Sequence, residues 1–558
     1  MAATGSKATG GILFSLGSAW RRQSMTTLLR GSSASVPSYA KASNVSESPW
    51  PGHALCYTVK KEQPEPLPTK VKGEVPKWIN GSLLRNGGGK FEVGKDSYNH
   101  MFDGLSLLTR YNIRNGKVSY QTNFQRSDAY IKAMEQNRIV MSEFGTTAHP
   151  DPCLGIFGRF MARFKPSQFT DNCNVNWMAI GDECYVMTET KEIRKIDPVT
   201  LETLDKVDLS KRMAVHTATA HPHITNDGIM YNMGSHYDRK SHYNIIKALP
   251  PDPGVMADPM SKASVLCSIP ASDSFPSYYH SFGMTDNYIV FLEQPLVLNL
   301  LKLRFIRIFK SGFSTTMKYQ KTRPARFHLI KRDTGELLSQ RFLADPLFCF
   351  HHINAYEEGG HVVVDLCCYT DESVIQSVAV AEMRNGMRTN APLIKSEGKR
   401  FILPVDREKT PGMNLNALDY SKATAVLNDD GSIHCTPEVI SDKYVELPRI
   451  NYEKHNGKPY QYFYGTSGDL WQLLKSDTRT ATSQVWMEEG ALPSEPVFIG
   501  APGSTSEDDG VVVSAVVSVQ EGKPSFLLVL DARDMKEVAR AEIDAEVIFG
   551  IHGMYLAN

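Results

Sequence analysis

Alternating apolar and polar positions, separated by tight-turn residues, run through most of the chain after residue 56. In residues 110–120 the pair Asn115–Gly116 stands between alternating apolar residues, the pattern of a two-residue β-hairpin. Similar hairpin patterns follow in residues 196–201, 329–337, 426–433 and 527–534. Residues 511–519 form a β-branched run that is typical of a buried strand. The chain is therefore predicted to be all-β.

Many hairpins and few helical patterns over about 500 residues favour a β-propeller, which closes on itself and leaves only short sheet edges. A large array of β-sandwiches is the competing architecture. Similarity between the hairpins is too weak to define a repeat period, so the pattern alone does not give the number of blades.

The start of the chain has a different composition. The first 46 residues contain five basic residues, no Asp or Glu, and many Ser, Ala and Thr. This composition is typical of a mitochondrial transit peptide, and a disordered cytosolic tail is the alternative. We expect residues 1–48 to form such a segment and residues 49–558 to form one folded domain.

Charge and cysteine content exclude several classes of protein. Lys plus Arg equals Asp plus Glu at 61 each, so the chain has no basic excess for nucleic acid, which is not expected as a partner. The nine cysteines are odd in number and include no Cys-x-x-Cys, which argues against a disulfide framework and a thiolate zinc site.

Histidines in short apolar or small-residue settings are the candidate chemistry. Imidazole suits iron, copper and zinc, so isolated histidines brought together by folding would make a metal site without thiolates. Ordinary half-buried histidines are the alternative. The inner strands of a propeller converge on one axis and could present one residue each to a common point. The segments concerned are residues 216–223, 278–283, 350–354 and 549–554.

Ten short motifs, in order across nearly the whole chain after residue 50, resemble those of the carotenoid cleavage oxygenase family. This resemblance implies a seven-bladed β-propeller with a helical and loop cap over an axis that carries one ferrous iron. The motifs lie at residues 80–89, 98–104, 143–146, 150–153, 188–190, 220–223, 279–282, 350–356, 493–496 and 549–553.

The resemblance also assigns expected roles. Carboxylates behind the ligand histidines would fix their tautomers, and two further residues would shape the cavity beside the iron. Dioxygen would be the co-substrate. The expected iron ligands are His221, His280, His351 and His552, the carboxylates are Glu189, Glu446 and Glu495, and the cavity residues are Phe144 and Thr188.

Two apolar segments with interspersed basic residues are expected to touch a membrane surface. In residues 153–165 the apolar positions recur at helical spacing, and residues 296–310 carry four cations, too many for a comfortable bilayer span. Packing of both segments against the propeller is the alternative. Cys153 is a candidate for acylation or an unmodified thiol.

Within the family, the chain looks most like enzymes that cleave carotenoids eccentrically at the 9',10' double bond in mitochondria. The implied products are an apo-10'-carotenal and an ionone-type ketone. Central cleavage at 15,15', retinyl-ester isomerohydrolase chemistry and a non-catalytic lipid-binding propeller are the alternatives.

Overall fold

The computed structural model describes residues 52–149, 153, 155, 170–238, 240–250, 258–309, 312–384, 395–406, 410–468 and 470–558. All of them belong to the unit Pro49–Asn558. The segment predicted to be a transit peptide lies outside the described residues, so that prediction stays open.

The predicted hairpins form. Asn115 and Gly116 both take positive φ, 52° and 74°, at the turn between the antiparallel strands β6 (Leu105–Arg114) and β7 (Lys117–Phe124). A two-residue turn of this kind needs left-handed backbone at both positions, which Asn and Gly tolerate. The chain is all-β as expected.

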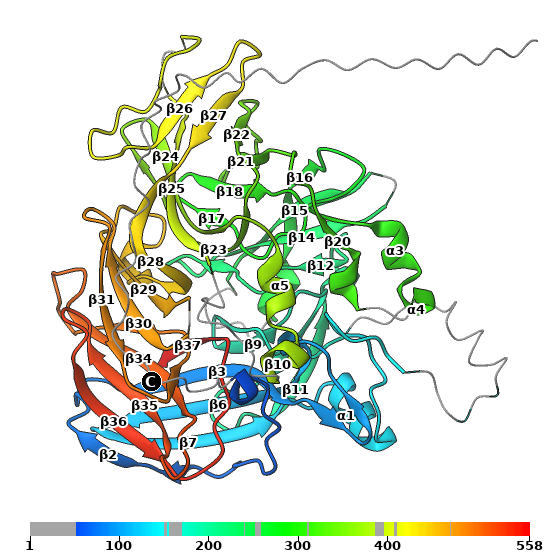
Figure 1. Ribbon diagram of the computed structural model, residues 1–558, viewed down its shortest axis with the longest axis vertical. Helices are drawn as coiled ribbons and strands as arrows, with labels where there is room; N and C mark the ends of the chain where they lie inside the picture. The colour runs from blue at the N-terminus through cyan, green and yellow to red at the C-terminus, as the bar shows by residue number, and fades with distance from the viewer. Residues whose placement is uncertain are drawn as a thin grey trace, which may run out of the picture. The chain divides into compact units, whose positions relative to one another are not determined.

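The described strands form seven principal sheets when the largest sheet is divided at the strand that two of them share. Figure 1 shows the sheets arranged around the centre of this unit. The first sheet contains β1 (Leu67–Pro68), β7, β6, β3 (Gly81–Lys90) and β37 (His552–Ala557). The second contains β11 (Thr203–Asp208), β10 (Glu192–Ile196), β9 (Glu183–Met187) and β8 (Asn176–Ile180). The third contains β12 (Thr217–Ala218), β13 (His223–Ile224), β14 (Met230–His236), β15 (His242–Ala248) and β16 (Ser264–Pro270).

The fourth sheet contains a hairpin donated from later in the chain, because β22 pairs in parallel with β27. Its strands are β17 (Gly283–Met284), β18 (Tyr288–Glu293), β21 (Ala325–Lys331), β22 (Phe342–Ala344), β27 (Ile433–Thr436) and β26 (Thr424–Leu427).

The fifth and sixth sheets share the long strand β28 (Glu438–Arg449), which pairs with β25 through its first part and with β29 through its last part. The fifth sheet adds β23 (Phe348–Glu358), β24 (His361–Tyr369) and β25 (Glu397–Pro404), and the sixth adds β29 (Tyr462–Ser467), β30 (Gln472–Asp477) and β31 (Thr482–Met487).

The seventh sheet joins the two ends of the domain. Strand β2 from near its start pairs with β36, while the last strand, β37, pairs with β3 of the first sheet, so the ring closes without long free edges. The strands of this sheet are β32 (Ala491–Pro493), β33 (Val497–Gly500), β34 (Gly510–Ser518), β35 (Ser525–Asp531), β36 (Glu537–Ile543) and β2 (Lys70–Gly73).

Strand β34 shows why a propeller needs continuous apolar runs. Val511 and Val513 pack in one hydrophobic cluster, and Val512 and Val516 pack in another. Both faces of the strand are therefore buried between neighbouring layers, which explains the absence of polar alternation in the predicted strand at 511–519.

The helices and short strands lie in the connections. They are η1 (Gly52–Cys56), β4 (Glu92–Val93), β5 (Asp96–Ser97), η2 (Met101–Asp103), α1 (Asp128–Gln136), η3 (Leu209–Lys211), η4 (Pro259–Lys262), β19 (Leu296–Leu298), α3 (Leu300–Arg304), α4 (Ile306–Phe309), η5 (Phe313–Thr316), β20 (Met317–Tyr319), α5 (Ser373–Ser377), α6 (Val380–Arg384) and α7 (Tyr452–His455). Three of them, η2, η5 and α5, contribute residues to the wall of a cavity that is also lined by His280, His351 and His552. These three helices therefore form part of the cap expected over the propeller axis.

Candidate metal centre

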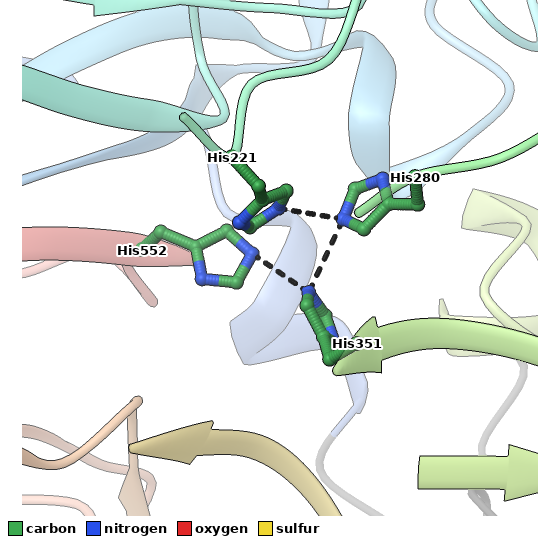
Figure 2. A group of neighbouring side chains, drawn as sticks. All are labelled: His221, His280, His351 and His552. Carbon is green, nitrogen blue, oxygen red and sulfur yellow. Dashed lines mark hydrogen bonds between the residues drawn. The ribbon is translucent and has the colours of Figure 1, made fainter. Parts of the chain in front are cut away.

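Four histidines, two in strands and two in loops next to strands, come together with their rings facing one another (Figure 2). His221 lies in the loop between β12 and β13, and His280 lies just before β17. His351 is part of β23, and His552 is the first residue of β37. Each position is at the inner end of its sheet, which is why residues separated by up to 331 positions in the sequence can share one point.

Their ring nitrogens converge closely. The candidate ligand atoms all lie within 4.8 Å of one another. Nε2 of His280 is 2.8 Å from Nε2 of His221 and 3.2 Å from Nε2 of His351, which in turn is 3.2 Å from Nε2 of His552. The predicted ligand set is thus brought together in space.

A carboxylate lies behind three of the four rings. An ionised carboxylate only accepts hydrogen bonds, so each of these histidines donates from Nδ1 and keeps a bare lone pair on Nε2. The Nδ1-to-carboxylate pairs are His280–Glu189 at 2.6 Å, His351–Glu446 at 2.5 Å and His552–Glu495 at 2.8 Å.

This tautomer decides how the inner nitrogens interact. With Nδ1–H directed at the carboxylates, the Nε2 atoms of His280, His351 and His552 have no proton to share between them. Three lone pairs converging at about 3 Å repel one another unless a cation lies between them. The arrangement therefore fits a metal ion, and four neutral nitrogen donors suit a borderline transition metal.

Burial favours the neutral form of two of the imidazoles, those of His221 and His552. Burial lowers the pKa of His552 to about 4, despite the opposing effect of the Glu495 carboxylate. The pKa of His221 is also held well below its ordinary value by burial and by the three neighbouring histidines. Neutral imidazole is the form that binds a metal.

Two of the carboxylates accept hydrogen bonds from tyrosine hydroxyls. Tyr278 donates its hydroxyl to Glu189 at 2.8 Å, and Tyr369 donates to Glu446 at 2.8 Å. Glu446 also accepts the backbone N–H of Leu447 at 2.8 Å. These bonds hold the carboxylates, and through them the ligand rings, in place.

The third carboxylate is held by cations. Although burial raises the pKa of Glu495, the charge of Arg449 and the hydrogen bond from His552 lower it to about 2. Arg449 Nε lies 2.9 Å from Glu495 Oε1, and Arg85 Nη1 lies 3.6 Å from Oε2. Glu495 is therefore ionised throughout the physiological pH range.

A cavity of about 160 Å³ opens onto three of the histidines and is lined mainly by apolar and aromatic side chains. A row of rings leads away from His280, with Phe350 at 5.2 Å, Phe102 a further 6.4 Å on, then Phe144 at 5.6 Å and Phe313 at 6.0 Å between centroids. Such a wall suits an elongated apolar ligand.

Both predicted cavity residues line this space. Thr188 precedes Glu189, and Phe144 packs against Phe102 and His100 in the aromatic row. Phe144 is linked to the ring that contacts His280 through Phe102, and it lines the same cavity as His280, His351 and His552.

Glu143 is a polar residue in the apolar wall. Its side chain is buried, and among the described atoms its Oε1 has no hydrogen-bond partner. Burial and the carboxylates of Asp103 and Asp171 raise its pKa well above the ordinary value. The neutral, protonated form of Glu143 is therefore favoured over the carboxylate.

Sequence reasoning missed the residues that hold the carboxylates. Tyr278, Tyr369, Arg85 and Arg449 are all distant in sequence from at least one partner, and Arg85 and Glu495 are 410 positions apart. Tyr278 stands two positions before a ligand histidine, which is the one local signal that could have indicated it.

The chain matches the family model described as retinal pigment epithelial membrane protein over residues 57–557. The chain belongs to this family, the carotenoid cleavage oxygenases. It is 42% identical over 518 residues to the mitochondrial carotenoid-cleaving dioxygenase of Mustela putorius furo, covering 89% of this chain and 95% of the relative. It is also 42% identical over 515 residues to the β,β-carotene 15,15'-dioxygenase of Mus musculus, covering 89% and 90%.

The fold of this carotenoid cleavage oxygenase family member is shared with a solved structure. Cobalt-substituted Synechocystis ACO superposes with a TM-score of 0.74 at 22% identity, covering 92% of this chain and 99% of that one. The likeness agrees with the propeller seen here.

The two predicted surface segments have different outcomes. Residues 153–165 lie outside the described residues except for Cys153, whose side chain is exposed, and Gly155. The second segment is shorter than predicted, because Leu296–Leu298 forms the buried strand β19. Its exposed part begins in α3, where Leu301 is 68% exposed and Phe305, just after the helix, is 38% exposed. No described helix has the length and apolar character needed to cross a bilayer.

Proposed function

We propose that the protein is an iron(II)-dependent dioxygenase that cleaves a carotenoid at the 9',10' double bond, giving an apo-10'-carotenal and an ionone-type ketone. The observation that carries the proposal is the cluster of four imidazoles opening onto an aromatic cavity. The relative from the ferret, Mustela putorius furo, is named as a carotenoid-cleaving dioxygenase, which supports a carotenoid as the substrate.

In this proposal His221, His280, His351 and His552 hold one ferrous ion, whose chemistry is the activation of dioxygen. Glu189, Glu446 and Glu495 accept the Nδ1 protons and keep the Nε2 lone pairs directed inward. The donor set contains no thiolate, which disfavours a structural zinc site.

The cavity wall positions the polyene and excludes water. Phe350 packs edge-to-face against His280, and Phe102 and Phe144 continue the row of rings along the cavity wall. Aromatic faces stabilise positive charge that develops on a conjugated chain during oxidation. Thr188 contributes a small side chain to the wall beside Glu189 and leaves room for the substrate.

Central cleavage at 15,15' is the second candidate. The mouse relative named for that reaction is as similar to the chain as the ferret enzyme. The two reactions share the metal and the cavity, and they differ in how far the polyene slides past the metal before it is cut.

We further propose that the enzyme works in mitochondria, peripheral to a membrane, and that residues 1–48 direct its import. The acid-free start of the chain and the name of the ferret relative support the location. Exposed Leu301 and Phe305, with Lys302 and Arg304 between them, support contact of this surface with a bilayer.

The test is chromatography of the products after iron-loaded protein is incubated with β-carotene and oxygen. We expect an apo-10'-carotenal and β-ionone. Retinal would instead establish central cleavage, and unreacted substrate in the presence of bound iron would refute the oxygenase proposal. The His280→Ala variant is the matched control and is expected to give no product.

A further inference from the structure

The three carboxylates behind the ligand histidines are not electrically equivalent. Glu189 and Glu446 accept hydrogen bonds from the hydroxyls of Tyr278 and Tyr369, and in the described part of the chain neither forms an ion pair with an arginine or a lysine. Glu495 instead lies between two guanidinium groups. The environment behind His552 therefore differs in charge from that behind His280 and His351.

The contacts to Glu495 are close and largely shielded from water. Arg449 approaches both carboxylate oxygens, Nε to Oε1 at 2.9 Å and Nη2 to Oε2 at 3.1 Å. The backbone N–H of Gly553, next to His552, donates to Oε2 at 3.1 Å. Arg85 is 1% exposed and lies 3.6 Å from the same oxygen. Charges in such a setting are poorly screened by salt.

The two arginines differ in the contacts that they make with the backbone. Arg85 also donates to the backbone carbonyls of Glu495, Gly550 and Ile551, so it holds the chain that leads to His552. Arg449, with a side chain that is 28% exposed, makes one backbone contact, to the carbonyl of Gly553. Arg449 is consequently the residue whose charge can be changed with the least disturbance of packing.

Two positive charges beside Glu495 act on a bound metal in the same direction. A carboxylate neutralised by guanidinium draws less strongly on the Nδ1 proton of His552, so that imidazole donates less electron density through Nε2. The guanidinium charges also repel positive charge at the metal directly. Both effects oppose the loss of an electron from the metal.

We propose that Arg449, together with Arg85, is a positioning and tuning pair that keeps the metal centre in the ferrous state when oxygen is present. A dioxygenase needs the ferrous ion to meet dioxygen without being converted to the ferric ion between turnovers. The inference rests on the proposed function in one respect, namely that the metal is iron.

The experiment uses the full chain loaded with ferrous iron under anaerobic conditions. The wild type is compared with Arg449→Gln, which removes the charge, and Arg449→Lys, which keeps it. Arg540→Gln is the matched control, because Arg540 also lies between two carboxylates, Glu488 and Glu537, but on the outer strand β36. Iron content is measured first, and the iron midpoint potential and the rate of ferric formation in air without substrate follow.

For Arg449→Gln we expect an unchanged iron stoichiometry and a tenfold lower ferrous-to-ferric ratio at a fixed potential, which is a downward shift of about 59 mV for one electron. Ferric iron should form correspondingly faster. Arg449→Lys should restore most of the wild-type potential, and Arg540→Gln should match the wild type. If Arg449→Gln does not fold, Arg449→Met is the second charge-removing variant.

Two results would overturn the inference. One is a charge-removing variant that binds iron at the wild-type potential. The other is an Arg449→Lys variant shifted as far as Arg449→Gln, because geometry rather than charge would then be responsible. A wild-type protein that binds no iron would be a different failure, that of the proposed function.

Discussion

Replacing Glu446 by glutamine tests whether the carboxylates support metal binding. Glu446 is buried, its Oε2 accepts the Nδ1 proton of His351, and its Oε1 accepts the hydroxyl proton of Tyr369. Glutamine has the same shape, and its carbonyl oxygen can still accept from His351 while its NH₂ group faces the Tyr369 oxygen. Glu446→Gln therefore removes the negative charge and little else.

The size of the effect follows from the chemistry of the pair. Losing the carboxylate partner of a metal-binding histidine commonly weakens metal affinity by about 10–100-fold. At about 1.4 kcal/mol per tenfold change, this corresponds to roughly 1.4–2.8 kcal/mol of metal-binding free energy. The neutral amide polarises His351 less than the anion does, so we expect Glu446→Gln to fall within this range.

The assay is an anaerobic titration of the apo-protein with ferrous iron against a competing chelator. Glu143→Gln is the matched control, since Glu143 is another buried glutamate of the cavity but forms no described hydrogen bond or ion pair with any of the four clustered histidines. Its affinity for iron should equal that of the wild type. An unchanged affinity in Glu446→Gln, or an equal loss in both variants, would refute the reasoning.

Three further predictions concern the cavity and the surface. The pKa of Glu143 in the folded protein lies well above its ordinary value of about 4.5, so the stability contributed by the neutral acid is lost as pH rises from about 4.5 toward that folded pKa. In denaturant titrations above about pH 4.5, the free energy of unfolding of the wild type should therefore fall relative to that of Glu143→Gln. A difference between the two that does not vary with pH would contradict this. Phe144→Ala should raise KM for β-carotene more than it lowers kcat in steady-state assays, because the ring lines the cavity and its described ring contacts are with His100, Phe102 and Phe313 rather than with the four clustered histidines. A selective fall in kcat would place it at the reacting bond. The double variant Leu301→Asp with Phe305→Asp should bind at least tenfold more weakly to anionic vesicles in sedimentation assays while retaining iron, and unaltered binding would exclude this surface as the contact.

Local strand chemistry made much of the fold predictable. Asn115–Gly116 predicts its hairpin because the turn requires left-handed backbone, and the β-branched run at 511–519 becomes β34. The connections between sheets were not predictable from pattern. The parallel pairing of β22 with β27, and the sharing of β28 by two sheets, depend on contacts between distant segments that leave no local periodicity.

The site was predictable to a different degree. The four candidate ligand histidines and the three glutamates were predicted from the family resemblance, since histidines spread over more than 300 residues carry no spacing signal of their own. Arg449 and Tyr369 were not foreseen, because their significance lies in which carboxylate they face. The error at residues 296–298 has a simple cause: an apolar strand and an apolar surface segment look alike over three residues.

The most direct test of the central claim is X-ray absorption spectroscopy of the anaerobically iron-loaded protein, combined with metal analysis. We expect one ferrous ion per chain with four imidazole nitrogen ligands, and the loss of one nitrogen ligand in the His552→Ala variant. A protein that takes up no iron, or whose iron is coordinated by sulfur or by fewer than four imidazoles, would contradict the account.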